Sequence, residues 1–261
     1  MLEFDGDLPQ GALLGTERSA FAEAIEKTGA IWLRGDWDAF EIDDGTGAIT
    51  EWRSATGSAK ATPANPNDGN GLLAEVGPYS GLRCRPEVNC GLVIDKATES
   101  AGTFSMAVIY QPPEDGQSKT LLTVNTGYSG GSDAESNYLF LSDAGDYFTA
   151  KDVRGAVEVV TPVTSSPSGL RMAIVTLNGN KLALAENLGA PTVIEGADAG
   201  MRTGADLFIG CRSHRSGLKK TLGGAAILEV LFWPKHALLT PRGAEDKAAY
   251  LDLKRYFLWE Y

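Results

Sequence analysis

The sequence predicts an all-β fold, in which two antiparallel sheets pack as a sandwich or jelly roll, with a short helical segment at the N-terminus and a helix at the C-terminus. Short runs of β-branched and aromatic residues recur along the chain, bounded by Gly, Ser, Asp and Pro, as expected for many strands joined by tight turns. Little helical periodicity lies between these runs, which disfavours a parallel sheet. Helical amphipathicity marks the two ends of the chain.

Composition limits the classes of partner. The 261-residue chain has a net charge of −11. So acidic a surface repels phosphate backbones, and we expect no nucleic-acid partner. No segment has the ~18 consecutive apolar residues that crossing a bilayer requires, so we expect no membrane insertion. The first residues lack the basic start and apolar core of a secretory signal, so we expect synthesis in the cytoplasm without a signal peptide.

Residues 1–29 differ from the rest and are expected to form a docking segment, with the jelly-roll domain over residues 30–261. Thr16 is the expected N-cap of a short helix, and Phe21, Ala24 and Ile25 then share one face at i, i+3 and i+4. A helix this short is not stable alone in water. It is therefore expected to dock on the main domain or on a partner.

The expected strands follow the apolar runs. They span residues 104–110, 120–126, 137–142, 156–163, 206–210 and 225–233. Residues 171–187 are expected to form a hairpin whose turn is Asn178-Gly179, since these residue types accept positive φ. Residues 54–78 are polar and rich in Pro and Gly, and we expect a long surface loop there.

The chain ends on an expected amphipathic helix. Thr240 is the predicted N-cap, and Pro241 suits the first turn. The apolar stripe consists of Ala249, Tyr250, Leu253 and Phe257. Such a helix can cover an edge or a face of the sandwich.

The closing part of the chain resembles concanavalin A-like, laminin-G-like jelly-roll domains. The matching features are Ile209-Gly210, the strand from Gly224 to Trp233, Leu239-Thr240, Glu245, Tyr250-Leu251, and Lys254 to Tyr256. Residues 31–57 are similar to the opening strands of bacterial and phage members, and the likeness extends over about residues 30–258. The family contains lectins, glycosidases, adhesion modules and virion proteins, so the resemblance implies the fold without choosing among these functions.

One stretch is similar to a catalytic motif. Glu41, Ile42 and Asp43 match the first half of the motif of laminarinase-like glycosidases, but Gly45 and Thr46 stand where the second Glu is needed. Turn chemistry explains the stretch better. With two histidines in the chain, His214 and His236, and no nucleophile elbow, we expect that the protein is not an enzyme.

Three cysteines do not make a disulfide framework, since one must be left over. Cys84 and Cys90 can pair, but buried thiols in a reducing cytoplasm are expected. Cys211 and His214 have neither the number nor the spacing of a zinc site. We therefore expect no cofactor, and leave open a Ca²⁺ ion at the loop carboxylates Asp133 and Glu135.

Two loops carry the candidate sugar-binding residues, which combine an aromatic ring with polar groups. The first loop offers Tyr128 with Asn125, Asp133 and Asn137, and the second is a basic island containing Arg212, His214, Arg215 and Lys219. Five tryptophans are assigned to packing: Trp32, Trp37 and Trp52 in the core or at strand edges, and Trp233 and Trp259 against the final helix.

These features, together with the functions found in the family that the chain resembles, predict a carbohydrate-binding adhesin module. We expect it in a spike or fibre of a phage or phage-like particle, where release by lysis makes a signal peptide unnecessary. Cell-surface polysaccharide is the expected ligand, other particle proteins would bind residues 1–29, and the chain can be a homo-oligomer. Two alternatives stay open: a purely structural virion component, and a glycoside hydrolase on the same fold.

Overall fold

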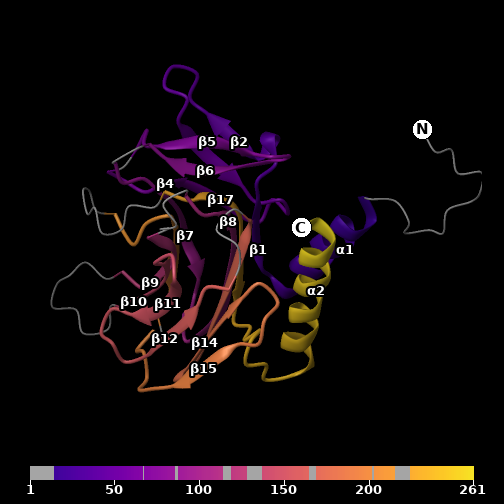
Figure 1. The fold of residues 1–261 in the computed structure, drawn as a ribbon, viewed down its shortest axis with the longest axis vertical. Coiled ribbons are helices and arrows are strands. Elements are labelled where there is room, and N and C mark those ends of the chain that lie inside the picture. The colour runs from indigo at the N-terminus through magenta and orange to yellow at the C-terminus, as the bar shows by residue number, and fades with distance from the viewer. Residues whose placement is uncertain are drawn as a thin grey trace, which may run out of the picture.

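The computed structural model describes residues 15–66, 68–85, 88–113, 119–127, 137–164, 169–201, 203–214 and 224–261. Two antiparallel sheets pack face to face, and helices α1 (Gly15–Thr28) and α2 (Ala244–Glu260) lie together on one side of the sandwich (Figure 1). The expected all-β sandwich with a helix at each end is confirmed. Neither helix in the described ranges is long and apolar enough to cross a membrane.

The first sheet lies beneath the helices. Its strands, in spatial order, are β15 (Thr192–Glu195), β14 (Lys181–Glu186), β13 (Arg171–Asn178), β8 (Thr103–Gln111), β17 (Ala226–Pro234), β6 (Tyr79–Cys84) and β5 (Gly71–Val76), and β1 (Ile31–Arg34) also pairs with β17. Both faces of its central strands are covered. On β8, Met106 and Val108 point into the core between the sheets, while Ala107 and Ile109 pack beneath the helices. The continuous apolar run in the sequence follows from this double burial.

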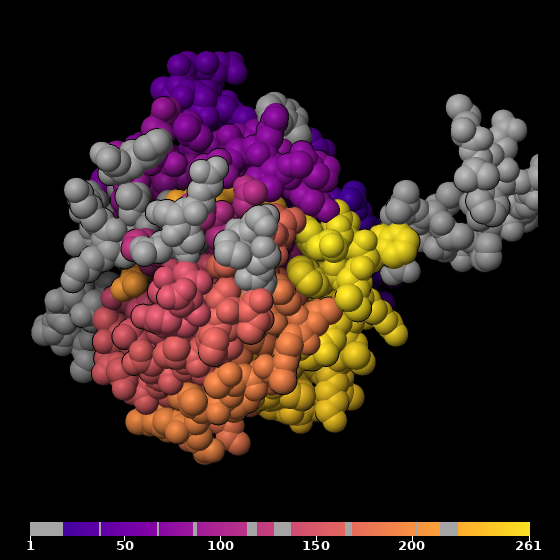
Figure 2. Space-filling view, in the orientation of Figure 1, coloured from indigo at the N-terminus to yellow at the C-terminus, as the bar shows by residue number. Residues whose placement is uncertain are grey.

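The second sheet forms the opposite side of the sandwich. Its order is β12 (Glu158–Pro162), β11 (Tyr147–Asp152), β10 (Tyr138–Asp143), β9 (Thr120–Asn125), β16 (Ala205–Ile209), β7 (Leu92–Thr98), β4 (Lys60–Pro63), β3 (Ile49–Arg53) and β2 (Phe40–Ile42), with a 3₁₀ turn, Trp37–Ala39, before β2. Side chains alternate: Leu139 and Leu141 enter the core, while Phe140 points outward. In the space-filling view, α2 (yellow) lies along one side of the strands drawn in salmon and orange (Figure 2).

Helix α1 docks on the domain through the face expected from its sequence. Phe21 and Ile25 are buried, and the Phe21 ring stacks on Tyr256 of α2 at 4.2 Å between ring centroids. Gly29 follows the helix at φ +63°, the left-handed conformation that ends helices. Thr16 is not the N-cap, because the helix already includes Gly15.

Helix α2 begins later than expected. Gly243, not Thr240, precedes its first turn. The reason is the side chain of Asp246, which accepts a hydrogen bond from the backbone N–H of Arg242 at 2.9 Å and so fixes the start of the helix there.

The buried face of α2 also differs from the expected stripe. It runs through Asp246, Ala249, Leu253 and Tyr256, while Tyr250 and Phe257 flank it half-buried. Trp259, expected to pack, is 47% exposed because it lies about a quarter turn away from this row. The other tryptophan assignments that the structure describes are confirmed, since the side chains of Trp32, Trp52 and Trp233 are buried. The Trp37 side chain lies outside the part of the chain that the structure describes, so its assignment stays a prediction.

Two local predictions need correction. The 171–187 hairpin is confirmed, but Asn178 pairs with Lys181, so its turn consists of Gly179-Asn180 with positive φ at Gly179. Residues 54–78 are not one loop, because they contain β4 and β5. β4 was missed because it is short and polar: only Ala61 is fully buried, and its other residues carry no apolar alternation. β5 does carry Leu, Ala and Val, but it is flanked by Gly, Asn and Pro residues that favoured a loop.

Cys84 and Cys90 form a disulfide, which corrects the expectation of buried thiols. The chain turns back after β6, and the two Cα atoms lie 5.3 Å apart, inside the range that a disulfide requires. Disulfides persist in oxidising compartments, so this pairing removes the argument for a reducing cytoplasm. Cys211 is a buried free thiol.

Candidate functional site

The outer face of the second sheet carries the candidate site. Thr123 of β9, Phe140 of β10 and Phe208 of β16 alternate with core residues and therefore point away from the sandwich core. After β16 the chain turns back over this face, and the hydroxyl of Thr123 donates to the carbonyl oxygen of Cys211 at 3.0 Å. Gly91 permits this close approach, since a Cβ there would lie 2.3 Å from the Cys211 sulfur.

Arg212 is held on this face by two contacts with neighbouring strands. Its guanidinium carbon lies 3.6 Å from the centroid of the Phe140 ring, and its Nε donates to the hydroxyl of Thr120 at 3.1 Å. Burial lowers the pKa of Arg212, although a hydrogen bond with Tyr138 opposes the effect. A guanidinium held over a ring and by a hydrogen bond has limited freedom to turn, and its N–H groups suit carboxylates and sugar hydroxyls.

Asn125 joins the two loops that the sequence singled out. Its Nδ2 donates to the carbonyl oxygen of Arg212 at 3.0 Å, and its Oδ1 accepts from the N–H of Gly127 at 2.8 Å. With 3% exposure, the Asn125 side chain positions the loops from within the protein. The bases of the loops after β9 and β16 therefore lie side by side.

Asn137 also has a structural position. Its side chain is fully buried, and Nδ2 donates to a carboxylate oxygen of Asp152 at 3.1 Å and to the carbonyl of Ala199 at 2.5 Å. Its Oδ1 accepts from the N–H of Tyr138 at 2.8 Å. The amide is therefore engaged with the protein itself and anchors the base of the loop.

His214 is exposed on the same outer face as Arg212. Its ring lies edge-on to Phe208 at 5.1 Å between centroids, and Nδ1 lies 3.2 Å from the carbonyl oxygen of Asn65. We call Arg212, His214, Phe140 and Tyr138 together the Arg212 surface. The remaining predicted binding residues, Tyr128, Asp133, Arg215 and Lys219, lie outside the described residues, and so does Glu135.

The described residues contain no cluster of three or more His, Cys, Asp or Glu side chains placed to hold a metal ion. A Ca²⁺ ion at Asp133 and Glu135 stays a prediction. Cys211 is fully buried, and burial raises the pKa of its thiol to about 12, which keeps it protonated and unreactive.

The Glu41–Asp43 stretch is confirmed as turn chemistry. The Asp43 carboxylate accepts from both the N–H and the hydroxyl of Thr46 at 2.7 Å, which closes the turn between β2 and β3. Glu41 is exposed and pairs with Arg53 on the neighbouring strand.

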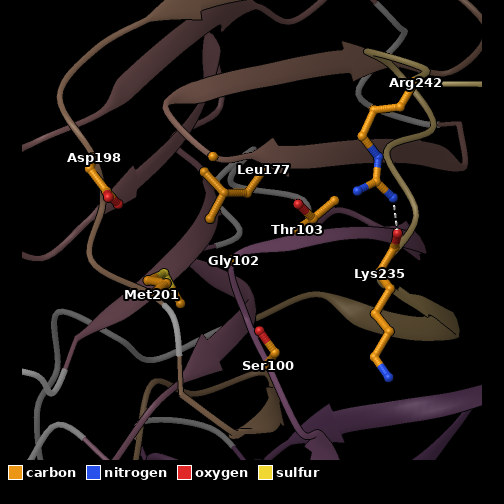
Figure 3. Close-up of a pocket in the computed structure, with 9 residues that line it drawn as sticks. Ser100, Gly102, Thr103, Leu177, Asp198, Met201, Lys235 and Arg242 are labelled. Carbon is orange, nitrogen blue, oxygen red and sulfur yellow. Dashed lines mark hydrogen bonds between the residues drawn. The ribbon is translucent and has the colours of Figure 1, made fainter.

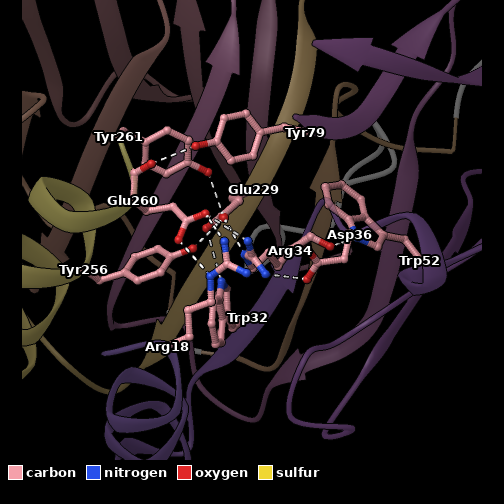
Figure 4. A network of polar contacts seen from close by, with 10 residues as sticks. All are labelled: Arg18, Trp32, Arg34, Asp36, Trp52, Tyr79, Glu229, Tyr256, Glu260 and Tyr261. Atoms are coloured by element: carbon pink, nitrogen blue, oxygen red, sulfur yellow. Dashed lines mark hydrogen bonds and ion pairs between the residues drawn. The ribbon is translucent and has the colours of Figure 1, made fainter. Parts of the chain in front are cut away.

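Sequence reasoning missed a buried polar network centred on Glu229 of β17 (Figure 4). The hydroxyl groups of Tyr256 and Tyr261 donate to Glu229 Oε1 at 2.6 and 2.8 Å, and the Nε1–H of Trp32 donates to Oε2 at 3.2 Å. Arg34 Nε lies 3.3 Å from Oε1. Burial raises the pKa of Glu229 to about 7, while these donors and the Arg34 charge oppose the rise.

A second carboxylate extends the network to both helices. Glu260 of α2 binds Arg34 at 2.9 Å and Arg18 of α1 at 2.6 Å, and its carbonyl oxygen accepts from the Tyr79 hydroxyl at 2.7 Å. A buried carboxylate beside phenols and guanidiniums has the composition of a catalytic site. Here the side chain of Glu229 is 1% exposed and its partners are the protein's own groups, so the network fastens α1 and α2 to the sheet. A Glu inside the apolar run of residues 225–233 was the available signal.

No protein-family model and no curated protein matches the chain. Solved structures do match. A Trypanosoma rangeli sialidase in complex with sialic acid aligns at 14% identity with a TM-score of 0.55, covering 93% of this chain and 38% of that one. An arabinofuranosidase complexed with arabinofuranosyl-α-1,2-xylobiose aligns at 12% identity and a TM-score of 0.55, covering 90% and 64%.

Identities this low establish the fold alone, and the chain spans only about a third to two thirds of these proteins. The resemblance to concanavalin A-like jelly-roll sandwiches is confirmed at that level. The fold is thus one that occurs within a sialidase and an arabinofuranosidase whose structures hold bound sugars.

The same structures correct the expectation that the protein is not an enzyme. The matched chains are a sialidase and an arabinofuranosidase, so this fold occurs within glycoside hydrolases. The expectation rested on missing motifs of other hydrolase families. The lack of one family's motif does not exclude other glycoside hydrolases, because their catalytic groups differ between families.

Proposed function

We propose that the chain is a carbohydrate-binding module whose Arg212 surface recognises cell-surface polysaccharide. The observation that carries the proposal is the hydrogen bond from Asn125 to the Arg212 carbonyl, at 3.0 Å. It joins, on one face, the bases of two loops that were selected separately for sugar-binding composition.

The chemistry of the Arg212 surface fits sugars. Tyr138 supplies a half-buried aromatic ring. The buried Phe140 ring supports the Arg212 guanidinium, which supplies hydrogen-bond donors that are in place before any ligand arrives. His214 adds a further polar edge. The protein as a whole is acidic and repels an anionic glycan. The positive charge of the Arg212 surface attracts such a glycan, which favours binding there over other faces.

We propose further that this module is an adhesin in a spike or fibre of a phage or phage-like particle. Residues 1–29 would attach it to other particle proteins, through surfaces other than Phe21 and Ile25, which pack within the chain. The Cys84–Cys90 disulfide suits a location outside a reducing cytoplasm. A purely structural virion component and a glycoside hydrolase are the alternatives.

The test is binding of the purified chain to bacterial capsular and surface polysaccharides, comparing wild type with Arg212→Ala, Arg212→Lys and Arg53→Ala. Arg53 is an exposed, ion-paired arginine on β3 and serves as the matched control. Loss of a charge-assisted hydrogen bond weakens binding by about tenfold or more, so Arg212→Ala should fall by that factor, Arg53→Ala should not, and Arg212→Lys should rescue only part.

The same samples are assayed for released reducing ends. Unchanged affinity of Arg212→Ala would show that the Arg212 surface is not the site. Release of reducing ends would favour the hydrolase alternative. Absence of both binding and release across the panel would favour the structural alternative.

A further inference from the structure

A cavity of about 470 Å³ opens at one end of the sandwich, where four connections meet (Figure 3). They are the links β7–β8, β13–β14, β15–β16 and β17–α2. The cavity is lined by the adjoining strand ends at Thr103 of β8 and Leu177 of β13, and by link residues that include Asp198, Met201, Lys235 and Arg242. A space of this size accommodates one or two sugar units. None of these residues belongs to the Arg212 surface.

One wall of the cavity is cationic and held in place by the main chain. Lys235 adopts a left-handed conformation, φ +67°, and its N–H donates to the carbonyl oxygen of Thr103 at 3.0 Å. The Arg242 guanidinium donates to the carbonyl oxygen of Lys235 and lies 3.4 Å from Asp246. A left-handed lysine is uncommon, and such backbone conformations concentrate at ligand sites.

The charge of Lys235 is only weakly neutralised. Its Nζ lies 3.8 Å from Glu99, and the two side chains are 67% and 93% exposed. Exposed pairs of this kind are screened by water and contribute little. The ammonium group is therefore accessible to a second anion.

The other side of the cavity has different chemistry. Asp198 lies across Leu177 from Lys235 and Arg242 in the close-up, and its carboxylate accepts from the N–H of Gly200 at 2.8 Å (Figure 3). Leu177 and Met201 lie between the charged walls, but each is 1% exposed and belongs to the core, so they offer a ligand almost no apolar surface. The cavity thus presents cations on one side and a carboxylate on the other.

We propose that this cavity binds a carboxylated sugar unit of the uronic-acid type. The sugar carboxylate pairs with Lys235 and Arg242, and hydroxyl groups on the far side donate to Asp198. A neutral sugar lacks the first interaction, and a simple carboxylate lacks the second. The proposal concerns a site separate from the Arg212 surface.

Titration calorimetry of the full chain with glucuronate, and with glucose as the uncharged probe, tests the proposal. A single sugar unit of this size is expected to bind with a Kd on the order of 1 mM. Glucose should bind about tenfold more weakly, because it lacks one charge-assisted contact. Amide NMR shifts at Gly102 and Gly179, which line the cavity, locate the binding.

Three variants sharpen the test. Lys235→Gln and Lys235→Gly should both bring glucuronate to the affinity of glucose, and the Gly variant removes the left-handed strain, so its loss of binding does not come from misfolding. Lys27→Gln is the matched control, an exposed lysine 4.0 Å from Glu23. It should bind as wild type.

Equal affinity for glucuronate and glucose, undiminished binding by both Lys235 variants, or no shift at Gly102 and Gly179 would each overturn the proposal. Polysaccharide binding that depends on Arg212 is scored with different probes and variants. The failure of one proposal is therefore distinguishable from the failure of the other.

Discussion

Replacement of Glu229 by Gln removes a titratable group from the centre of the buried network while keeping its volume. Burial raises the pKa of Glu229 from 4.5 to about 7, so the folded state binds this proton more tightly than the unfolded state does. Stability from this group is therefore complete below the unfolded pKa and is lost as the pH rises through the folded pKa. The wild-type free energy of unfolding should fall by about 2–3 kcal/mol between about pH 5 and about pH 8 from this group.

The Glu229→Gln variant should lack this part of the pH dependence. At about pH 5, where the wild-type side chain is largely protonated, the variant should be less stable by ~1–3 kcal/mol, because an amide cannot accept from Tyr256, Tyr261 and Trp32 as a carboxyl group does. The difference between the two proteins should shrink as the pH rises. The measurement is urea unfolding, followed by tryptophan fluorescence, across this pH range.

Subtraction of the variant's profile from that of wild type isolates Glu229 from the other titrating groups. Parallel profiles, with a constant gap at all pH values, would refute the reasoning, because they would show that Glu229 has the same pKa in the folded and unfolded chain. A gap that widens with pH would show that the Arg34 charge outweighs burial.

Three further stability predictions are tested by the same unfolding measurement. Joint replacement of Cys84 and Cys90 by Ser should cost about 2 kcal/mol, since the disulfide closes a short loop, and reducing agent should then have no further effect. Asn137→Ala should cost ~2–3 kcal/mol because it leaves buried acceptors unpaired, and a loss below about 0.5 kcal/mol would contradict its structural role. Leu253→Ala, in the buried face of α2, should lower the free energy of unfolding by ~2–5 kcal/mol. Leu258→Ala, at a 72% exposed position of the same helix, should change it by less than about 0.5 kcal/mol. Equal losses in the two variants would contradict the assigned helix face.

Local sequence signals predicted the long apolar strands, because the burial of such a strand determines its own residue types, but they missed β4 and β5. Residues 225–233 are apolar throughout since β17 is covered on both faces, and the Asn178-Gly179 pair indicated the hairpin although its turn lies one residue further on. Phe21 and Ile25 indicated the docked face of α1 by their spacing. The order of strands within each sheet is not encoded in such short-range patterns.

The candidate site was predicted less well because residue type does not reveal orientation. Asn125 and Asn137 have the side chains of sugar ligands, yet both are buried and hydrogen-bond the protein's own backbone. Arg212 was selected for its charge, but its position over Phe140 comes from a fold-back after β16 that no local pattern encodes. The Glu229 network joins residues more than 190 positions apart, as its contact with Trp32 illustrates, so only the folded chain reveals it.

The ion pair between Arg18 and Glu260 fixes the direction in which the domain can be presented. It holds the beginning of α1 against the end of α2, on the side of the sandwich covered by the helices. The Arg212 surface lies on the outer face of the other sheet. Any linker, neighbouring domain or solid support joined beyond either helix would therefore depart from one side, and the Arg212 surface would face away from it. Immobilised through either end, the domain would display this surface to the surrounding medium.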